Sequence, residues 1–484
     1  MNHHGTRRLA ERVLVVVWDG MRPDLITADG TPRLFELARG GTTFTRASSV
    51  YAPMTRPASA SISTGCHPGR HGIHGNLMPY PGRADRVLHT GDLAQLAELR
   101  RFHDGRLTRV ETLAEAVHRR GGRFAVLTTG TAGQASLLDA ERVGVLVNPD
   151  LVYPETAATR IEARFGAPPP KTVPADPLNT WLVDVLLEYI LPEVEPDAAV
   201  VWLCEPDNSQ HATGLGTEQA RAGIASSDRQ LGRILDWIER DGTPTAVIVT
   251  SDHGHTTVSG YVDVAAELAA AGFGGLLDDG LIRPLEGQLA AAESLPERES
   301  GRIVEWFAAQ AWVDTFVSWG HAPADRSRTV AVEKLWAGHG QDLPTLPLLA
   351  YTHPWTREVN EHGVAGAALV SPVKAHRAMH GSLSPDELVP TLVLGGAGIR
   401  AAVSDRPAGI IDIVATVQTL LGHDALLPTD GRVLWEALDT GDGTQGGDDG
   451  EVSRERLVRQ GGGWLVRDTY GSGAYLAVEI DESQ

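Results

Sequence analysis

Val13-Leu14-Val15-Val16-Val17-Trp18-Asp19 is the stretch of sequence that decides the fold. Six apolar residues, mostly valine, are followed directly by a carboxylate, and such a short apolar run is typical of a strand buried on both faces. Two similar runs occur later, 199–203 ahead of Asp207 and 246–249 ahead of Asp252-His253. Open α/β sheets carry their chemistry beyond the carboxyl ends of the strands, so these polar residues are expected to meet.

Helical patterns alternate with the strand-like runs over the first 260 residues. The helical patterns and the strands that follow them are 112–120 and 123–128, 181–190 and 198–203, and 226–239 and the run that ends at Thr250. This alternation is typical of parallel strands joined by crossover helices. The expected fold class is α/β, with a mostly parallel central sheet flanked by helices.

The strand–helix rhythm stops near residue 262 and resumes near residue 388. Residues 263 to 350 contain Ala-rich helical patterns, Pro-containing loops and isolated tryptophans, which indicate an insertion over the site. Gly441 to Gly450 is rich in Gly and Asp and is typical of a flexible linker. The expected units are a first part of the catalytic core (1–262), an insertion or cap (263–350), the remainder of the core (351–440), and an acidic linker with a C-terminal hairpin (441–484).

Composition limits the partners and the compartment. The 484 residues carry a net charge of -20, which argues against a nucleic-acid polymer or an anionic membrane as a partner. Two cysteines provide no disulfide framework. The first apolar run is too short to cross a bilayer and lacks a signal-peptide cleavage site, so we expect a cytoplasmic protein. A phosphate substrate would need a local positive field, which bound metal ions supply.

Two segments combine a carboxylate and an imidazole at a strand end. Asp207 and His211 are four residues apart and suit a zinc ion, although a helix-capping Asp with a surface His is the more common origin of this spacing. Asp252 and His253 directly abut a buried strand, which favours metal binding over a solvated loop. His255 is left open between a residue that supports a ligand and an exposed residue.

Thr55 and His380 are weaker candidates on their own. Thr55 precedes Pro57 and a run of small residues, and a position at the start of a helix would place its hydroxyl where the dipole favours an alkoxide and phosphate. A plain capping threonine is the alternative. His380 is followed by Gly, and a surface histidine is the ordinary reading. The competing histidines are His339, His353, His362 and His376.

Taken together, these segments resemble the alkaline phosphatase superfamily, and within it the nucleotide pyrophosphatase/phosphodiesterase branch. The resemblance rests on the stretch Ser61-Ile62-Ser63-Thr64-Gly65-Cys66-His67-Pro68-Gly69-Arg70-His71-Gly72-Ile73-His74-Gly75-Asn76 and on the order of the motifs. It implies an alkaline-phosphatase-like fold and two divalent metal ions, of which zinc is the first expectation and manganese or iron the alternatives. By the resemblance, one ion is bound by Asp19, Thr55, Asp252 and His253, and the other by Asp207, His211 and His380.

The resemblance also implies a mechanism, in which Thr55 attacks phosphorus in line and forms a covalent phospho-threonine that water then hydrolyses. An Asn donor to a phosphoryl oxygen is expected three residues after the nucleophile, but that position holds Ala58. Arg56, Ser59 or Asn76 is expected to replace it, and Arg56 and Asn76 are the predicted substrate-binding residues. The same block resembles sulfatases, but a threonine at position 55 cannot become the aldehyde that those enzymes use.

The expected activity is cleavage of a phosphodiester or nucleotide pyrophosphate bond in a small-molecule substrate. Phosphomonoester hydrolysis, phosphonate ester hydrolysis and a metal-dependent phosphosugar mutase remain alternatives, and the oligomeric state is open. The insertion is expected to set specificity. Its tryptophans could stack a nucleobase, although a buried core position is the more common fate of the set Trp306, Trp312, Trp319, Trp336 and Trp355. Three further residues, His89, Asp92 and Glu205, could line the site or be ordinary surface or capping residues.

Overall fold

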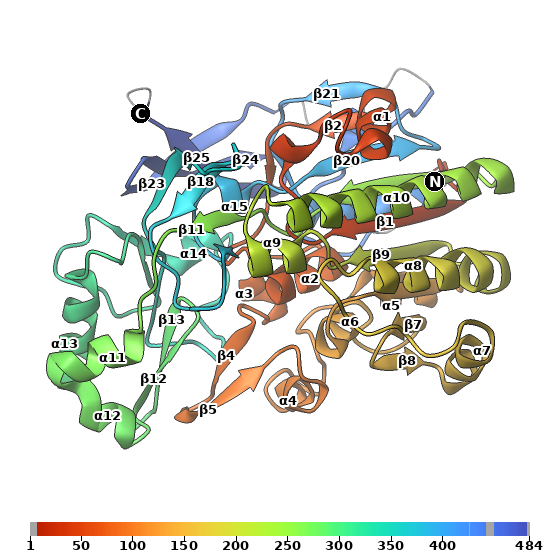
Figure 1. Cartoon of the computed structure of the whole chain (residues 1–484). Coiled ribbons are helices and arrows are strands. Elements are labelled where there is room, and N and C mark those ends of the chain that lie inside the picture. The colour runs from red at the N-terminus through yellow and green to blue at the C-terminus, as the bar shows by residue number, and fades with distance from the viewer. Residues whose placement is uncertain (1–6, 425, 442–449, 482–484) are drawn as a thin grey trace, which may run out of the picture.

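The computed structural model of the chain describes residues 7–424, 426–441 and 450–481 (Figure 1). Most of the predicted Gly/Asp-rich linker therefore lies outside the described residues. Among the helices in these three ranges, none combines the length and apolarity needed to span a bilayer.

The centre of the molecule is a nine-stranded sheet built around β1 (Arg12–Trp18). β1 pairs in parallel with β10 (Thr245–Thr250) on one side and β9 (Ala198–Leu203) on the other, while β20 and β8 run antiparallel to their neighbours. This confirms the predicted α/β class and the mostly parallel sheet. The order across the sheet is β21 (Ala402–Ser404), β2 (Thr42–Phe44), β20 (Leu392–Gly396), β10, β1, β9, β6 (Phe124–Thr128), β7 (Val145–Asn148) and β8 (Leu151–Tyr153).

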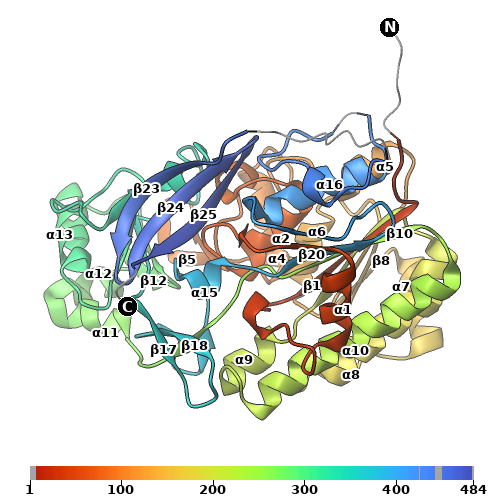
Figure 2. The same ribbon diagram turned by 90° about the horizontal axis from the view of Figure 1, so that it is seen from above.

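Helices cover both faces of this sheet (Figures 1 and 2). Val13, Val15 and Val17 pack into one hydrophobic cluster, and Leu14, Val16 and Trp18 pack into another, as the alternation of side chains along a strand requires. The first cluster includes residues of α2 (Thr55–Thr64), α5 (Leu113–Arg119), α6 (Ala132–Leu138) and α16 (Ile413–Leu420), and the second those of α1 (Pro32–Gly40), α8 (Asp176–Val185) and α10 (Glu218–Asp241).

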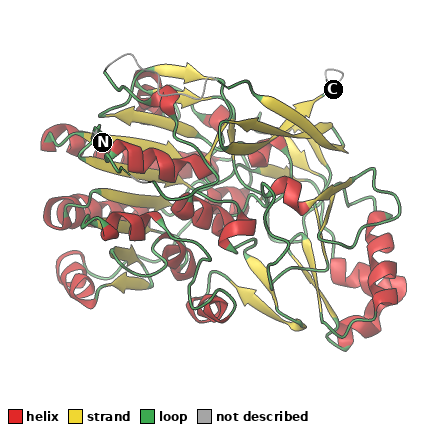
Figure 3. Cartoon of the chain, turned by 180° about the vertical axis from the view of Figure 1, so that it is seen from behind, coloured by secondary structure: helices red, strands yellow, loops and turns green. Residues whose placement is uncertain are grey.

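The segment between β10 and β20 contributes a second, separate group of strands. Figure 3 shows these strands and the helices α11 (Val264–Leu268), α12 (Gly274–Asp278) and α13 (Glu297–Ala308) set to one side of the central sheet. They form a five-stranded sheet of β12 (Ile282–Leu285), β13 (Gln288–Ala291), β16 (Leu349–Tyr351), β14 (Phe316–Ser318) and β15 (Thr329–Ala331). A four-stranded sheet of β17 (Trp355–Val359), β18 (Ala365–Ala368), β11 (Thr256–Val258) and β19 (Ala378–Met379) connects this region to the core.

The tryptophans of the insertion serve mainly as core residues. Trp306 and Trp312 pack edge-to-face on one another and on Phe307. Trp336 is fully buried, and its indole N–H donates a 2.6 Å hydrogen bond to the carbonyl oxygen of Tyr51. These contacts give the tryptophans a packing role and leave the nucleobase-stacking role without support.

The C-terminal region is a three-stranded antiparallel sheet of β23 (Ser453–Gln460), β24 (Gly463–Tyr470) and β25 (Gly473–Ile480), one strand more than the hairpin expected from the sequence. The additional strand, β23, is rich in charged residues, so it lacks the apolar pattern that predicted the other two. This sheet packs on the core, where the Tyr475 hydroxyl donates to Asp412 Oδ1 at 2.9 Å.

Candidate metal centre

Three adjacent parallel strands end at the same edge of the sheet, and each is followed by an acidic residue. Asp19 follows β1 and Asp252 follows β10, while Asp207 begins α9 (Asp207–Thr213) four residues beyond β9. Backbone bonds hold the ends together: the Gly20 N–H donates to Asp252 Oδ1 at 3.0 Å, and the Asp207 N–H donates to the Asp19 carbonyl at 3.0 Å.

The structure brings the predicted carboxylates and imidazoles into two overlapping groups within the described residues. In each group the ligand atoms all lie within 4.8 Å of one another. One group is Asp207, His211, His255 and His380, and the other is Asp19, Asp207 and His253. Asp252 adjoins the second group, with its Oδ2 3.0 Å from His253 Nε2. Asp207 thus lies between the two positions rather than in one only.

Unsatisfied polar atoms point to cations at these positions. Buried polar atoms are normally hydrogen-bonded, yet several here have no hydrogen-bond partner in the described part of the chain. They come from all three aspartates and two histidines: Asp19 Oδ1, Asp207 Oδ1, Asp252 Oδ2, His253 Nε2 and His255 Nε2. Carboxylate oxygens and imidazole nitrogens are ligand types that zinc and related divalent ions accept, so the residues fit two bound cations.

The pKa shifts show the same imbalance of charge. Burial, and then the carboxylates of Asp252 and Asp207, raise the pKa of Asp19 well above its ordinary value. Burial lowers the pKa of His253, but Asp252 and Asp19 outweigh it and raise that pKa to about 9. The neighbouring carboxylates therefore disfavour the charged form of Asp19 and favour the charged form of His253, so the site attracts positive charge, which a divalent cation would supply.

Each predicted histidine ligand is oriented by a backbone carbonyl. The Nδ1 atoms of His211, His253 and His380 lie 2.7, 3.0 and 3.1 Å from the carbonyl oxygens of Ala378, Gly254 and Pro53. A carbonyl oxygen only accepts hydrogen bonds, so Nδ1 carries the proton and Nε2 remains available as a ligand.

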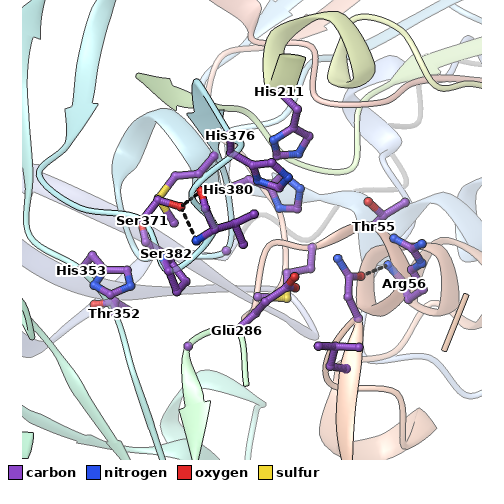
Figure 4. Close-up of a pocket in the computed structure, with 18 of the residues that line it drawn as sticks. Thr55, Arg56, His211, Glu286, Thr352, His353, Ser371, His376, His380 and Ser382 are labelled. Carbon is purple, nitrogen blue, oxygen red and sulfur yellow. Dashed lines mark hydrogen bonds between the residues drawn. The ribbon is translucent and has the colours of Figure 1, made fainter. Parts of the chain in front are cut away.

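Thr55 opens α2 beside a cavity of about 360 Å³ that also contains Asp207, His211 and His380. Figure 4 shows its hydroxyl directed into this cavity, with Arg56 next to it. Thr55 is only 7% exposed, and as the first residue of the helix it lies where backbone N–H groups have no partner within the helix. The structure thus brings Thr55 to the same cavity as Asp207, His211 and His380, three of the predicted metal ligands.

The predicted substrate-binding residues also line this cavity, and Asn76 contacts the start of the helix. The Arg56 backbone N–H donates to Asn76 Oδ1 at 3.3 Å, which leaves the Asn76 NH₂ as a donor. The Ser59 hydroxyl is already donated to the Thr55 carbonyl at 2.6 Å, so Ser59 is not the replacement donor. Ala58 is fully buried in a core cluster and carries no donor, so a contact to a phosphoryl oxygen has to come from another residue of the cavity.

The other residues that the sequence suggested for the site fall into two groups, those that line the cavity and those with a structural role. His89 and His353 line the cavity, and His376 lines it while packing on His211 with ring centroids 4.1 Å apart and planes tilted by 39°. Asp92 caps α4 (Leu93–Glu98) by accepting from the Gln95 N–H. Glu205 is buried and accepts from the Ala175 N–H at 2.8 Å, which is a structural role.

Two residues of the site were missed or left open by sequence reasoning. Glu286, at the turn between β12 and β13, lines the cavity, and its carboxylate has no hydrogen bond or ion pair with any described residue. Burial raises the pKa of Glu286. Nothing in the sequence distinguishes this glutamate from the other acidic residues of the insertion. His255 lies in the metal group, and its place two residues after His253 was the available signal.

Comparison with known proteins identifies the family of this chain. A family model described as type I phosphodiesterase / nucleotide pyrophosphatase matches residues 13–306. The chain belongs to this family.

Individual relatives are distant. Ectonucleotide pyrophosphatase/phosphodiesterase family member 7 of Mus musculus is 23% identical over 251 residues, which is 51% of this chain and 51% of that protein. The same member of Rattus norvegicus is 23% identical over 258 residues, 52% of each. The chain therefore matches about half the length of these curated relatives.

Solved structures extend the likeness over most of the chain. Alkaline phosphatase PafA superposes with a TM-score of 0.65 at 12% identity, covering 89% of this chain and 99% of that one. Murine ectonucleotide pyrophosphatase/phosphodiesterase 5 gives 0.61 at 16% identity, with 87% and 97% covered. Phosphonoacetate hydrolase from Sinorhizobium meliloti gives 0.57 at 19% identity, with 85% and 96% covered. These values show that the fold is alkaline-phosphatase-like, as the sequence predicted.

Proposed function

We propose that this chain is a two-metal-dependent phosphoester hydrolase that cleaves a phosphodiester or nucleotide pyrophosphate bond through a covalent phospho-threonine intermediate. The observation that carries the proposal is the cluster of buried carboxylates and imidazoles with unsatisfied ligand atoms. Asp207, His211 and His380 of this cluster line the same cavity as Thr55 at the start of α2.

The metal ligands we assign are those that the resemblance implied. Asp19, Asp252 and His253, with the Thr55 oxygen, would hold one cation, and Asp207, His211 and His380 the other. Zinc is the first candidate because of the mixed nitrogen and oxygen ligands, with manganese or iron as alternatives. When bound, the two cations would lower the pKa of the Thr55 hydroxyl and offset the negative charge of the phosphoryl group.

The protein's own groups would position the reaction. The Thr55 oxygen would attack phosphorus in line as the opposite P–O bond breaks and the alcohol or nucleotide leaves with that oxygen. Water would later attack the same phosphorus, break its bond to the Thr55 oxygen and release the phosphoryl group. The start of α2 favours negative charge on the Thr55 oxygen because the positive end of the helix dipole lies there. Asn76 would donate its NH₂ to a phosphoryl oxygen, since its Oδ1 is already held by the Arg56 N–H.

The cavity favours a substrate with little negative charge beyond the reacting phosphate. A phosphodiester carries one negative charge where a monoester carries up to two, and the Glu286 carboxylate in the cavity would repel the second whenever it is ionised, a form that Arg56, His211 and His89 favour against burial. Arg56, in the same cavity, is the cation that a monoesterase would need, so monoester or phosphonate ester hydrolysis remains the second candidate. The neighbours bind small ligands of this kind: murine family member 5 was solved with AMP, and the phosphonoacetate hydrolase with phosphonoacetate.

The decisive experiment compares purified wild type and Thr55→Ala on bis(p-nitrophenyl) phosphate, p-nitrophenyl phosphate, an aryl phosphonate ester and nucleotide pyrophosphates. We expect the diester or pyrophosphate to give the highest kcat/KM, and Thr55→Ala to lose roughly a thousandfold or more. Mass spectrometry of acid-quenched wild type should find phosphate or nucleotide on Thr55. Full turnover by Thr55→Ala would refute the covalent mechanism, and transfer between sugar phosphates without release of product would favour a mutase.

A further inference from the structure

His255 occupies the position of a ligand rather than that of a supporting residue. It is fully buried, and its Nε2 lies 3.2 Å from Asp207 Oδ1, the same distance as His211 Nε2, while His380 Nε2 lies at 3.7 Å. Neither His255 Nε2 nor Asp207 Oδ1 has a hydrogen-bond partner among the described residues. Their contact is thus close without the geometry of a hydrogen bond.

Three imidazoles surround one point next to Asp207. The ring centroids of His211 and His255 are 4.8 Å apart, those of His255 and His380 5.1 Å, and those of His211 and His380 5.0 Å. The plane of the His255 ring is nearly perpendicular to those of the other two rings, at 79° to His211 and 89° to His380. Equal separations with edges directed inward are what three imidazole ligands of one cation require, because each must present one nitrogen to the centre.

The remote nitrogen of His255 follows the pattern of the other ligands. Its Nδ1 faces the carbonyl oxygen of Gly20 at 3.4 Å, as those of His211 and His380 face Ala378 and Pro53 at shorter distances. The backbone at position 20 makes room for the ring. Gly20 has φ +73°, and a Cβ there would lie 2.4 Å from His255 Cε1, so any larger residue would displace the imidazole.

We infer that His255 is a fourth protein ligand, beside Asp207, His211 and His380, of one of the two cations. The inference rests on the proposed two-metal function and departs from the three-ligand set that the resemblance implied. Four ligands satisfy the usual tetrahedral shell of zinc, so water or substrate would have to join as a fifth ligand. The cation next to His255 would accordingly be the more tightly held of the two, and the first to be taken up by the metal-free protein.

The first test needs no variant. Metal-free wild type is given one equivalent of Co²⁺, and the strongly shifted ¹H resonances of exchangeable imidazole N–H protons are counted in H₂O and ²H₂O. Three such resonances are expected, one for each Nδ1–H of the three histidines. Two resonances would overturn the inference. A protein that takes up no Co²⁺ at all would contradict the proposed function as well, so the two failures are distinguishable.

The second test separates a ligand from a hydrogen-bond donor. His255→Gln keeps an N–H near Asp207 but removes the imidazole, and His255→Ala removes both. We expect both variants to bind the first equivalent of Co²⁺ or Zn²⁺ at least about 100-fold more weakly, measured by competition with a chromophoric chelator, with a changed Co²⁺ visible spectrum. The matched control is His376→Ala, which removes a neighbouring imidazole outside both metal groups and should keep the wild-type spectrum. Wild-type affinity and spectrum in His255→Gln would show that His255 only positions Asp207.

Discussion

Asn76 and Ser59 both lie close to Thr55, and they make opposite uses of their polar groups. The Asn76 side chain accepts the Arg56 N–H and keeps its NH₂ for the cavity, whereas the Ser59 hydroxyl is spent on the carbonyl of Thr55. Only Asn76 can donate to a phosphoryl oxygen without giving up a bond within the helix.

Asn76→Ala is expected to lower kcat/KM by about 100-fold, the usual effect of losing one donor to a developing oxyanion. Ser59→Ala, the control, should change kcat/KM by less than about threefold because its hydroxyl bonds only to its own helix. Steady-state kinetics on the best substrate of the panel measures both. Equal losses in the two variants would show that Asn76 acts through the packing of α2 alone.

Arg56→Ala on the same panel of substrates tests whether the Arg56 guanidinium contributes to substrate binding. Unchanged kinetics in this variant would exclude that contribution.

At the scale of elements, the hairpin β12–β13 brings Glu286 from the insertion to a cavity formed by the core. A carboxylate in that place should discriminate against dianionic substrates. We expect Glu286→Gln to raise kcat/KM for p-nitrophenyl phosphate relative to bis(p-nitrophenyl) phosphate by roughly 10-fold, which corresponds to about 1.4 kcal/mol. Glu293→Gln, an exposed position just after the same hairpin, is the control. If the ratio of the two kcat/KM values is unchanged in Glu286→Gln, charge repulsion by Glu286 does not contribute to substrate specificity.

The C-terminal sheet is joined to the core through a buried carboxyl group. Asp412 accepts hydrogen bonds from the Tyr475 hydroxyl and from the Arg432 and Gly409 N–H groups, and burial raises its pKa from 3.8 to about 6 even though Arg432 lowers it. Because the folded pKa is the higher one, protonation favours the folded state. The contribution is fully present below about pH 4 and is lost as the pH rises through about 6.

The free energy of unfolding of wild type, measured relative to that of Asp412→Asn, should therefore decrease as the pH rises from 4 to 7. Only wild type has a buried carboxyl group at this position that loses its proton in that range. Urea unfolding at each pH measures this difference. Tyr475→Phe keeps the carboxyl group, so a pH dependence should remain, moved to higher pH because the Tyr475 hydroxyl bond lowers the pKa of Asp412. This variant should also lose about 1 kcal/mol of hydrogen-bond energy. A difference that does not vary with pH would show that Asp412 is ionised throughout.

For the whole molecule, the metal centre should contribute to stability as well as to catalysis. Its aspartates come from three neighbouring strands at one sheet edge, and without cations their mutual repulsion opposes folding. A cation at 100 times its Kd adds about 2.7 kcal/mol to the free energy of unfolding. Removal of metal by dipicolinate, followed by dialysis, should lower the melting temperature in calorimetry by several degrees, and zinc should restore it. Asp19→Asn should reduce the difference in melting temperature between the metal-bound and metal-free forms, because it relieves repulsion between carboxylates in the metal-free state. An identical melting temperature with and without metal would contradict this account.

Much of the architecture could be predicted because it depends on local patterns. Residues 13–18 are apolar without interruption, as a strand buried on both faces requires. The two later runs before Asp207 and Asp252 have the same pattern. The charged strand β23 and the short strands of the insertion lack such a pattern, since their stability comes from pairing and packing with distant segments.

The sequence by itself determined the central parallel sheet, the residues at its carboxyl edge and the family, because continuous apolar runs and ordered motifs are local features. Only the tertiary structure decided which groups share the cavity. In the folded chain Ala58, one helical turn after Thr55, packs in the core, and the Asn76 side chain accepts a hydrogen bond from the Arg56 N–H. Glu286 of the insertion lines the same cavity as Thr55. The tertiary structure also set His255 at the same distance from Asp207 as His211. These contacts depend on how chain segments that are far apart in the sequence pack together, so no periodicity of the sequence predicts them.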